Sequence, residues 1–416
     1  MNPDLLSDWL KYINSNRPNE GEFGLDRLHS IFTEIVKKPL AQKTILVGGT
    51  NGKGTTVEYL QSFLISAGYS VGVYTSPHLI EFNERIRINN IPVDDEKIIR
   101  SFKLIDNLKQ ETRLTYFDYA TLAAFDIFSQ EELDFAILEI GIGGKYDPVN
   151  LINSEVSVIT NIELDHEKWL GSSLEEIGSQ KAAILKPGKV AILGSEKMPK
   201  SVTRQAKEIC SSVYQLNKDF KVCKEDSSWS YNFSDFNFLL ETIPYGNLNI
   251  DSASCAITAY KLLCEEKIDF RKSMEGTFLK GRCDVKDNFI LDVSHNPASI
   301  KHLVSFLDTN YKNKSFNAIF ATMSEKDNLS IIKEISHLIS EWNICSIEDG
   351  RFDANSLKLL TQSLTDKTVN IVDTVYSAVE RGYHKGTPQI VFGSFITVSE
   401  AYKALEKINI KNREIN

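Results

Sequence analysis

Apolar and polar residues follow two periods along the chain, one typical of amphipathic helices and one of short buried strands. Apolar positions recur at helical spacing over residues 5–13, 25–36, 56–67 and 117–129. Short apolar runs bounded by Gly, Asn or charged residues predict strands at 44–47, 71–75, 134–140 and 156–160. Alternation of this kind predicts an α/β fold in which helices cover both faces of a parallel sheet.

The same pattern restarts in the last third of the chain. Strand-like runs at 289–293, 316–321, 343–347 and 389–392 are separated by helical stretches. Between the two patterns, residues 211–245 are polar and aromatic, which predicts a small antiparallel sheet or a long loop. Polar residues at 281–288 predict a domain boundary, so we expect one domain at 1–283 and a second at 284–416.

Composition and charge exclude several classes of protein. The 416 residues carry 47 Lys and Arg against 56 Asp and Glu, a net charge of −9, which argues against nucleic acid as the main partner. The first residues lack the basic region and apolar stretch typical of a signal peptide, so we expect none, and no apolar run approaches the roughly 18 residues that span a membrane. The six cysteines form no CxxC pair, which indicates thiols in a reducing compartment. We therefore expect a cytoplasmic protein with no membrane partner.

The strongest motif is the glycine-rich segment 48–56, which follows a predicted strand and precedes a predicted helix. Glycines let backbone N–H groups approach phosphate oxygens, and Lys53 adds a positive charge. A Thr hydroxyl can ligate Mg²⁺. The pattern lacks the usual first glycine, and Gly54 separates Lys53 from Thr55. The alternative is a glycine-rich turn with an incidental lysine.

Two further strand ends carry candidate chemistry. Glu139 closes one predicted strand just before a second glycine cluster, where a carboxylate is well placed to hold a metal near phosphates. Asp165 and His166 follow another strand, on the side where α/β sheets bind ligands. A salt-bridged Glu and a structural His are the alternatives.

These residues, taken with other motifs in the same order, resemble the folylpolyglutamate synthase and dihydrofolate synthase family within the Mur ligase superfamily. The resemblance covers nearly the whole chain. Its motifs lie at 49–56, 74–79, 83–87, 114–117, 138–144, 164–171, 181–188, 281–282, 291–297, 326–327 and 391–395. It implies an N-terminal P-loop ATPase-like domain that also binds a pterin, and a smaller C-terminal Rossmann-like domain for glutamate ligation.

The resemblance implies that ATP activates a carboxylate as an acyl phosphate, which the amine of L-glutamate then attacks. The acceptors would be dihydropteroate and reduced folates, and the enzyme would act as a monomer. It implies that Lys53, His166 and Lys181 are catalytic, with Lys181 carried as a carbamate. Without the resemblance, Lys181 would be read as a surface or salt-bridged lysine. The implied Mg²⁺ ligands are Ser76, Glu139, His166 and Thr55.

Two sets of binding residues follow from the same resemblance. The implied nucleotide contacts are Asn51, Gly52, Lys53, Gly54, Thr55, Ser252, Arg282, Asp292 and His295. Ser252 stands where the family usually has Asn, which weakens the expectation of a contact there. Near His295, the pair Asn296–Pro297 also fits the start of a helix.

The implied pterin contacts are Glu22, Phe23, Thr115, Tyr116, Phe117, Asp118, Tyr146, Asp147 and Pro148. Phe117 can stack on a flat pterin, although core packing is the commoner fate of Phe in a helix. Asp118 stands where Glu is frequent, and Glu22 where Asp is frequent. The segment 145–150 also departs from the family pattern.

Three alternatives to a folate ligase lack support in the sequence. Another Mur-type ligase does not explain the segments 75–79 and 292–296. A regulator that had lost catalysis is expected to lack Lys53, Glu139 or His166, and all three are present. A GTPase-type switch is disfavoured by the second α/β pattern and by the absence of a guanine-reading signature.

Overall fold

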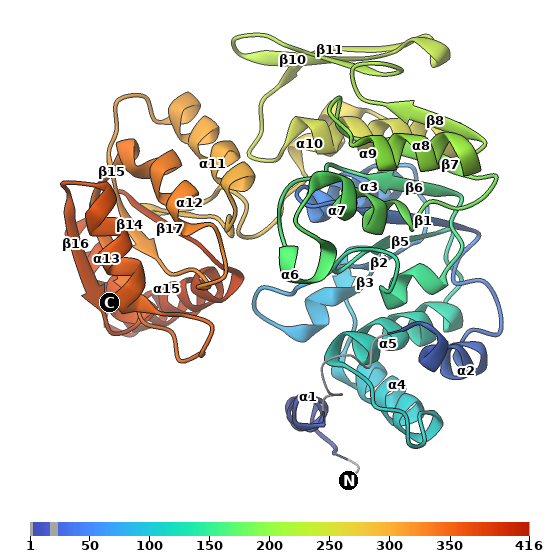
Figure 1. Cartoon of the computed structure of the whole chain (residues 1–416), viewed down its shortest axis with the longest axis horizontal. Helices are drawn as coiled ribbons and strands as arrows, with labels where there is room; N and C mark the ends of the chain where they lie inside the picture. Colours follow the sequence, from blue (N-terminus) through green and yellow to red (C-terminus); the bar gives the residue numbers. More distant parts are fainter. Residues whose placement is uncertain (1–2, 17–23, 416) are drawn as a thin grey trace. The chain divides into compact units, whose positions relative to one another are not determined.

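The structure is a computed structural model that describes residues 3–16 and 24–415. The chain divides into two compact units, Met1–Phe278 and Leu279–Asn416. Each is built around a mostly parallel sheet with helices packed against it, so the predicted α/β class is confirmed (Figure 1). Arg282 and Cys283 precede the expected boundary but belong to the second unit.

Within the described residues, the first unit holds an eight-stranded sheet in the order β4-β3-β2-β5-β1-β6-β7-β8. The strands from β2 to β8 in this order are parallel, and β3 and β4 extend the edge antiparallel. The strands are β1 (Lys43–Gly48), β2 (Val71–Tyr74), β3 (Ile86–Ile88), β4 (Ile91–Pro92), β5 (Phe135–Glu139), β6 (Val156–Ile159), β7 (Val190–Leu193) and β8 (Ser212–Gln215).

Helices cover both faces of this sheet, which is why β2, β5 and β6 are buried along their whole length. One face shares a core with α1 (Leu6–Ser15), α2 (Asp26–Ile35), α4 (Asp95–Leu108), α5 (Tyr116–Gln130), α7 (Leu174–Ala182) and α8 (Lys200–Ile209). The other side carries α3 (Lys53–Ser66), α9 (Ile250–Leu263) and α10 (Phe270–Glu275), which pack together (Figure 1). The four helices and four strands predicted for this unit are all present, and α3 begins at Lys53 rather than near residue 56.

The sequence left open whether residues 211–245 form a small antiparallel sheet or a long loop, and the structure shows the sheet. The first residues of the segment form β8, and the rest is a three-stranded antiparallel sheet in the order β11-β10-β9. The strands are β9 (Lys221–Lys224), β10 (Ser228–Phe233) and β11 (Phe238–Pro244). Buried Tyr231 and Phe233 of β10 pack against buried Phe220, which explains the aromatic composition of the segment.

The second unit has a six-stranded sheet within residues 279–415, in the order β12-β13-β17-β14-β15-β16. Only β12 is antiparallel to its neighbour in this part of the chain. The strands are β12 (Asp284–Lys286), β13 (Phe289–Leu291), β14 (Phe316–Phe320), β15 (Ile339–Cys345), β16 (Thr368–Val372) and β17 (Gln389–Phe392). The helices are α11 (Pro297–Asn310), α12 (Asn328–Ile335), α13 (Ala354–Leu364), α14 (Val375–Lys385) and α15 (Phe395–Ile415).

Strand β15 begins four residues before the predicted run at 343–347. Polar Ser340, Glu341 and Asn343 separate its buried apolar residues, so the strand has no continuous apolar run. In the part of the chain that the structure describes, no helix has the length and apolarity to cross a membrane. No disulfide joins any of the six cysteines, all of which lie among the described residues.

Candidate active site

Four loops of the first unit lie side by side at the carboxyl edge of its sheet. Strands β2, β5, β1 and β6 are adjacent and parallel, so the chain leaves each of them at the same edge. The strand ends and the loops that follow them carry Ser76, Glu139, the phosphate loop 48–55, and the Asp165–His166 pair. Candidates that are far apart in the sequence therefore collect at the edge where parallel sheets bind ligands.

The phosphate loop is tied to the loop that follows β6. The N–H groups of Thr50 and Asn51 donate to the backbone oxygen and the side-chain Oδ1 of Asn161, at 2.9 and 2.8 Å. The Thr160 hydroxyl donates to the Asn51 carbonyl at 2.6 Å, and the N–H of Glu163 donates to Thr50 Oγ1 at 3.0 Å. Sequence reasoning missed these bracing residues, although a polar run directly after a buried strand was a usable signal.

Two glycines give the loop its shape. Gly49 has φ +132°, and a Cβ there would lie 2.0 Å from Thr160 Oγ1 and 2.9 Å from the Thr160 nitrogen. Gly52 caps α3 with φ +82°, and a Cβ there would lie 2.6 Å from Ser252 Oγ. The Ser252 hydroxyl donates to the Gly52 carbonyl at 3.2 Å. The tight loop therefore presents backbone amides at the start of a helix, which is a cradle for phosphate.

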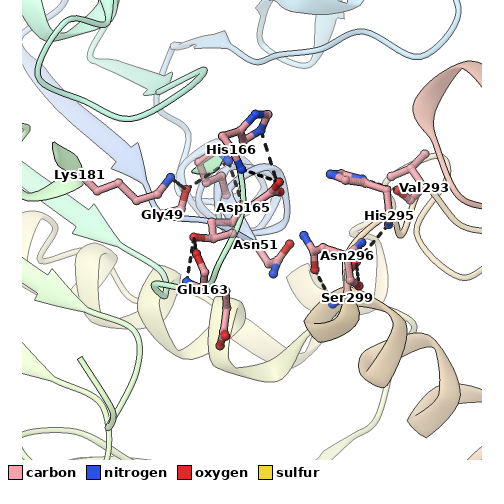
Figure 2. Close-up of polar contacts among 12 residues, drawn as sticks. Gly49, Asn51, Glu163, Asp165, His166, Lys181, Val293, His295, Asn296 and Ser299 are labelled. Carbon is pink, nitrogen blue, oxygen red and sulfur yellow. Dashed lines mark hydrogen bonds and ion pairs between the residues drawn. The ribbon is translucent and has the colours of Figure 1, made fainter. Parts of the chain in front are cut away.

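Two lysines approach the carbonyl oxygen of Gly49. Lys181 donates to it at 2.8 Å from α7 (Figure 2). Lys53 donates to it at 3.4 Å and to the Thr50 carbonyl at 3.1 Å. Lys181 is only 4% exposed. Burial, helped by the positive charge of Lys53, lowers the pKa of Lys181 to about 7. A bound anion would offset the repulsion between the two amines.

The metal candidates offer mainly oxygen donors. Glu139 is buried at the end of β5, and its Oε2 accepts the N–H of Ser76 from the neighbouring strand loop at 3.1 Å. With the hydroxyls of Ser76 and Thr55, this carboxylate makes a donor set that suits Mg²⁺. The ring nitrogen of His166 is a softer donor. The described residues contain no group of three His, Cys, Asp or Glu arranged to hold a metal.

His166 occupies a left-handed backbone position, φ +53°, immediately before the short helix α6 (Glu167–Leu170). Asp165 Oδ1 accepts the His166 N–H at 2.8 Å, and Asp165 Oδ2 lies 4.0 Å from the imidazole Nε2 (Figure 2). The His166 side chain is 33% exposed, against 8% for Asp165. The carboxylate thus holds the backbone of His166, while the imidazole remains partly exposed.

Two of the predicted pterin residues build the start of α5. The Thr115 hydroxyl accepts the Asp118 N–H at 3.0 Å, and Asp118 Oδ2 accepts the Thr115 N–H at 2.6 Å. Asp118 also pairs with Arg27 at 2.6 Å and is 2% exposed. The neighbouring Tyr116 ring lies 5.3 Å from the Arg85 guanidinium. Helix capping therefore accounts for the side chains of Thr115 and Asp118.

Phe117 and Asp147 both contact the turn that follows β5. A Cβ on Gly141 would lie 2.6 Å from the Phe117 ring, so the ring rests directly on this glycine. Asp147 accepts the N–H groups of Gly141, Ile142 and Val149 at 2.9, 3.1 and 2.9 Å. Burial raises the pKa of Asp147 to about 7, although these three donors lower it. The carboxylate therefore shapes the loop beside Phe117.

The other predicted pterin residues differ in accessibility. Tyr146 is 57% exposed, with the Lys145 ammonium 5.1 Å from its ring. Pro148 is buried at the first turn of a short 3₁₀ helix. Glu22 and Phe23 lie outside the described residues.

In the second unit, Asp292 organises the loop after β13. Its Oδ2 accepts the N–H of Cys283 at 2.8 Å, and its Oδ1 accepts the N–H of Ser294 at 2.8 Å. Asn296 caps α11 by accepting the Ser299 N–H at 2.9 Å, so the helix-start interpretation of Asn296–Pro297 is confirmed. This loop thus has a conformation fixed by its own polar side chains.

Arg282 and His295 collect beside one aromatic ring of the second unit. The Arg282 guanidinium lies 5.4 Å from the centre of the Phe395 ring, and the His295 ring lies 6.2 Å from it. His295 Nδ1 is 2.9 Å from the Val293 carbonyl oxygen (Figure 2). Arg282 and His295, two of the predicted nucleotide contacts, therefore both lie beside the Phe395 ring.

The chain is similar to known proteins over almost its whole length. The Mur ligase middle domain family matches residues 47–256. A dihydrofolate synthase/folylpolyglutamate synthase of Buchnera aphidicola subsp. Schizaphis graminum is 33% identical over 405 residues, covering 95% of this chain and 96% of the relative. The structure of Escherichia coli FolC in complex with DHPP and ADP is similar at 29% identity and TM-score 0.92, covering 98% of this chain and 99% of that chain. The bifunctional Yersinia pestis synthase complexed with AMPPNP and Mn is similar at 31% identity and TM-score 0.89, with 98% and 99% covered.

The geometry at Gly49 predicts that Gly49→Ala destabilises the first unit by about 3 kcal/mol, because the new methyl group overlaps Thr160. Gly188→Ala is a control for a positive φ without a steric contact, since Gly188 has φ +70° and no atom within 4 Å of the new Cβ. We expect about 1 kcal/mol for the control, from backbone strain alone. Urea unfolding measures both values. Equal losses of stability would show that the contact with Thr160 is unimportant.

Proposed function

The chain belongs to the dihydrofolate synthase/folylpolyglutamate synthase family of Mur ligases, and from this premise we propose that it joins L-glutamate to dihydropteroate and adds further glutamates to tetrahydrofolate. It is an ATP-dependent ligase. The observation that carries the proposal is the braced phosphate loop, with Lys53 and Lys181 sharing the Gly49 carbonyl. We place ATP and pterin binding in residues 1–283 and glutamate ligation in residues 284–416.

In the proposed reaction, an oxygen of the acceptor carboxylate attacks the γ-phosphorus of ATP. The bond to ADP breaks and an acyl phosphate forms. The amine of L-glutamate then attacks the acyl carbon, loses a proton, and displaces inorganic phosphate as the amide forms. Phosphoryl transfer of this kind depends mainly on positioning and on neutralising charge.

The first unit supplies both the positioning of the phosphates and the neutralisation of their charge. Asn51, Gly52, Gly54 and Thr55, in the part of the loop that opens α3, hold the phosphates, and Lys53 places its ammonium beside them. Mg²⁺, when bound, neutralises phosphate charge and orients its oxygens. Glu139 and the Ser76 and Thr55 hydroxyls would hold the ion, with His166 beside them. Ser252 contributes through its bond to the Gly52 carbonyl, in place of the amide usual in the family.

Lys181 has the chemistry that a carbamate requires. Carbon dioxide reacts with a neutral amine: a C–N bond forms, one proton leaves, and the neutral amine becomes an anionic carbamate. An ordinary lysine is protonated at neutral pH, whereas the pKa of Lys181 is lowered to about 7 by burial. The carbamate places a negative charge near the phosphate loop, where a second metal ion would be attracted.

The pterin and the rest of the nucleotide contact the other predicted residues. Tyr116, Phe117, Tyr146 and Pro148 are the proposed pterin contacts. Thr115 and Asp118 cap the helix that carries Phe117, and Asp147 fixes the turn on which the Phe117 ring rests. Arg282, Asp292 and His295 are the proposed nucleotide contacts of the second unit. We also propose that the enzyme acts as a cytoplasmic monomer.

The proposal is tested by incubating the protein with ATP, Mg²⁺ and L-glutamate, and with either dihydropteroate or tetrahydrofolate. We expect phosphate release and a glutamyl adduct, identified by mass, with each acceptor. An adduct with only one acceptor would restrict the activity to that step. If neither acceptor stimulates a folded protein that binds ATP, the folate assignment is wrong.

We predict that Lys53→Ala lowers kcat at least about 100-fold, because the variant loses a charge that stabilises the transferring phosphoryl group. The fold is retained, since the hydrogen bonds of the Lys53 ammonium go to the Gly49 and Thr50 carbonyls of its own loop. Phosphate-release kinetics and circular dichroism measure the two effects. Lys197→Ala, at an exposed position, is the control. Substantial ligation by folded Lys53→Ala would contradict the role given to this lysine.

We predict that ¹³C-labelled carbon dioxide forms a carbamate on Lys181 above pH 7, where the amine is neutral, and progressively less below that pH. A carbamate resonance in the ¹³C NMR spectrum measures it, and Lys181→Met abolishes it. Lys186→Met is the control, because burial lowers the pKa of Lys186 to about 8 but its amine bonds to Asn150 away from the loop. A resonance that disappears only in the Lys186 variant would place the carbamate on Lys186 and contradict the prediction.

A further inference from the structure

Helix α15 contacts the segment that carries Arg282 at two points. Phe395, at the start of the helix, places its ring 5.4 Å from the Arg282 guanidinium. Further along the helix, the Tyr402 hydroxyl accepts the N–H of Gly281 at 2.9 Å and donates to a carboxylate oxygen of Asp284. This hydroxyl therefore holds the chain on both sides of Arg282.

The backbone around Arg282 is bent in a way that needs such support. Gly281 has φ +68° and Cys283 has φ +45°, so left-handed positions flank the arginine. A non-glycine residue in this region is strained and persists only where its surroundings fix it. Asp292 holds the Cys283 N–H at 2.8 Å from one side. Tyr402 holds the Gly281 N–H from the other.

The Tyr402 hydroxyl is suited to this task because it both accepts and donates. The residue is 7% exposed. Burial and the hydrogen bond with Asp284 raise its pKa above the ordinary value, so the hydroxyl keeps its proton. A Phe at this position would leave the Gly281 N–H and the buried Asp284 carboxylate without this partner, and the bend would lose one of its two anchors.

We propose that Tyr402 is a positioning residue for Arg282: its hydroxyl fixes the backbone bend that directs the guanidinium toward a phosphate of the nucleotide. The inference rests on the proposed function, in which Arg282 contacts ATP. Tyr402 touches no substrate and acts through the arginine. Loss of the hydroxyl therefore weakens ATP binding only when Arg282 is present.

A double-mutant cycle on the full chain tests this, with ATP affinity measured by calorimetry in Mg²⁺ and without glutamate or pterin. We expect Tyr402→Phe to weaken ATP binding about fivefold alone and less than about twofold in an Arg282→Ala background. In turnover, the variant raises KM for ATP more than it lowers kcat. Tyr376→Phe is the control, because its hydroxyl bonds to Glu380 at 3.4 Å on α14, and we expect it to leave ATP affinity unchanged.

Equal effects of Tyr402→Phe in the two backgrounds, or no effect in either, would overturn the proposal. If Tyr402→Phe does not fold, Asp284→Asn takes its place in the cycle with the same expected sign, because it weakens the other bond of the same hydroxyl. Failure of the proposed function can be told apart from failure of the proposal for Tyr402. It shows as absence of glutamyl adducts with wild-type protein, whereas the cycle needs only ATP binding.

Discussion

The backbone turn at Gly49 is the constraint on which the rest of the site depends. The residue has no space for a side chain beside Thr160, and its carbonyl oxygen accepts an ammonium hydrogen of buried Lys181 at 2.8 Å. The turn thereby connects the loop after β1 to the loop after β6 and to α7. Because this packing fixes where the phosphate loop lies, it also fixes where Lys53 can place its charge.

The same packing creates the electrostatic character of the site. An amine held away from water next to a second amine favours its neutral form, which lowers the pKa of Lys181 to about 7. On the neighbouring strands, buried Glu139 is held against the Ser76 amide. The edge of the sheet thus combines an anion cradle with a carboxylate and hydroxyls, which is the combination that metal-assisted phosphoryl transfer needs.

The sequence predicted the central strands β1, β2, β5 and β6, several helices and the phosphate loop, because apolar runs and glycines report local structure directly. It did not predict β3, β7 or β16. It could not distinguish a residue that binds a ligand from one that caps a helix or turn: Asp118 and Asp147 are implied pterin contacts, yet their carboxylates accept backbone N–H groups of nearby turns. Thr160 and Asn161 were missed because their partners in the phosphate loop lie more than 100 residues away in the chain. Such contacts become visible only when the strand order is known.

The central claim is that the braced loop transfers a phosphoryl group to the acceptor carboxylate before glutamate attacks. The most direct measurement uses dihydropteroate labelled with ¹⁸O in both carboxylate oxygens, with ATP, Mg²⁺ and L-glutamate. An acyl phosphate predicts one ¹⁸O atom in each released inorganic phosphate, with the other retained in the amide, as read by mass spectrometry. Unlabelled phosphate accompanying amide formation would contradict the account.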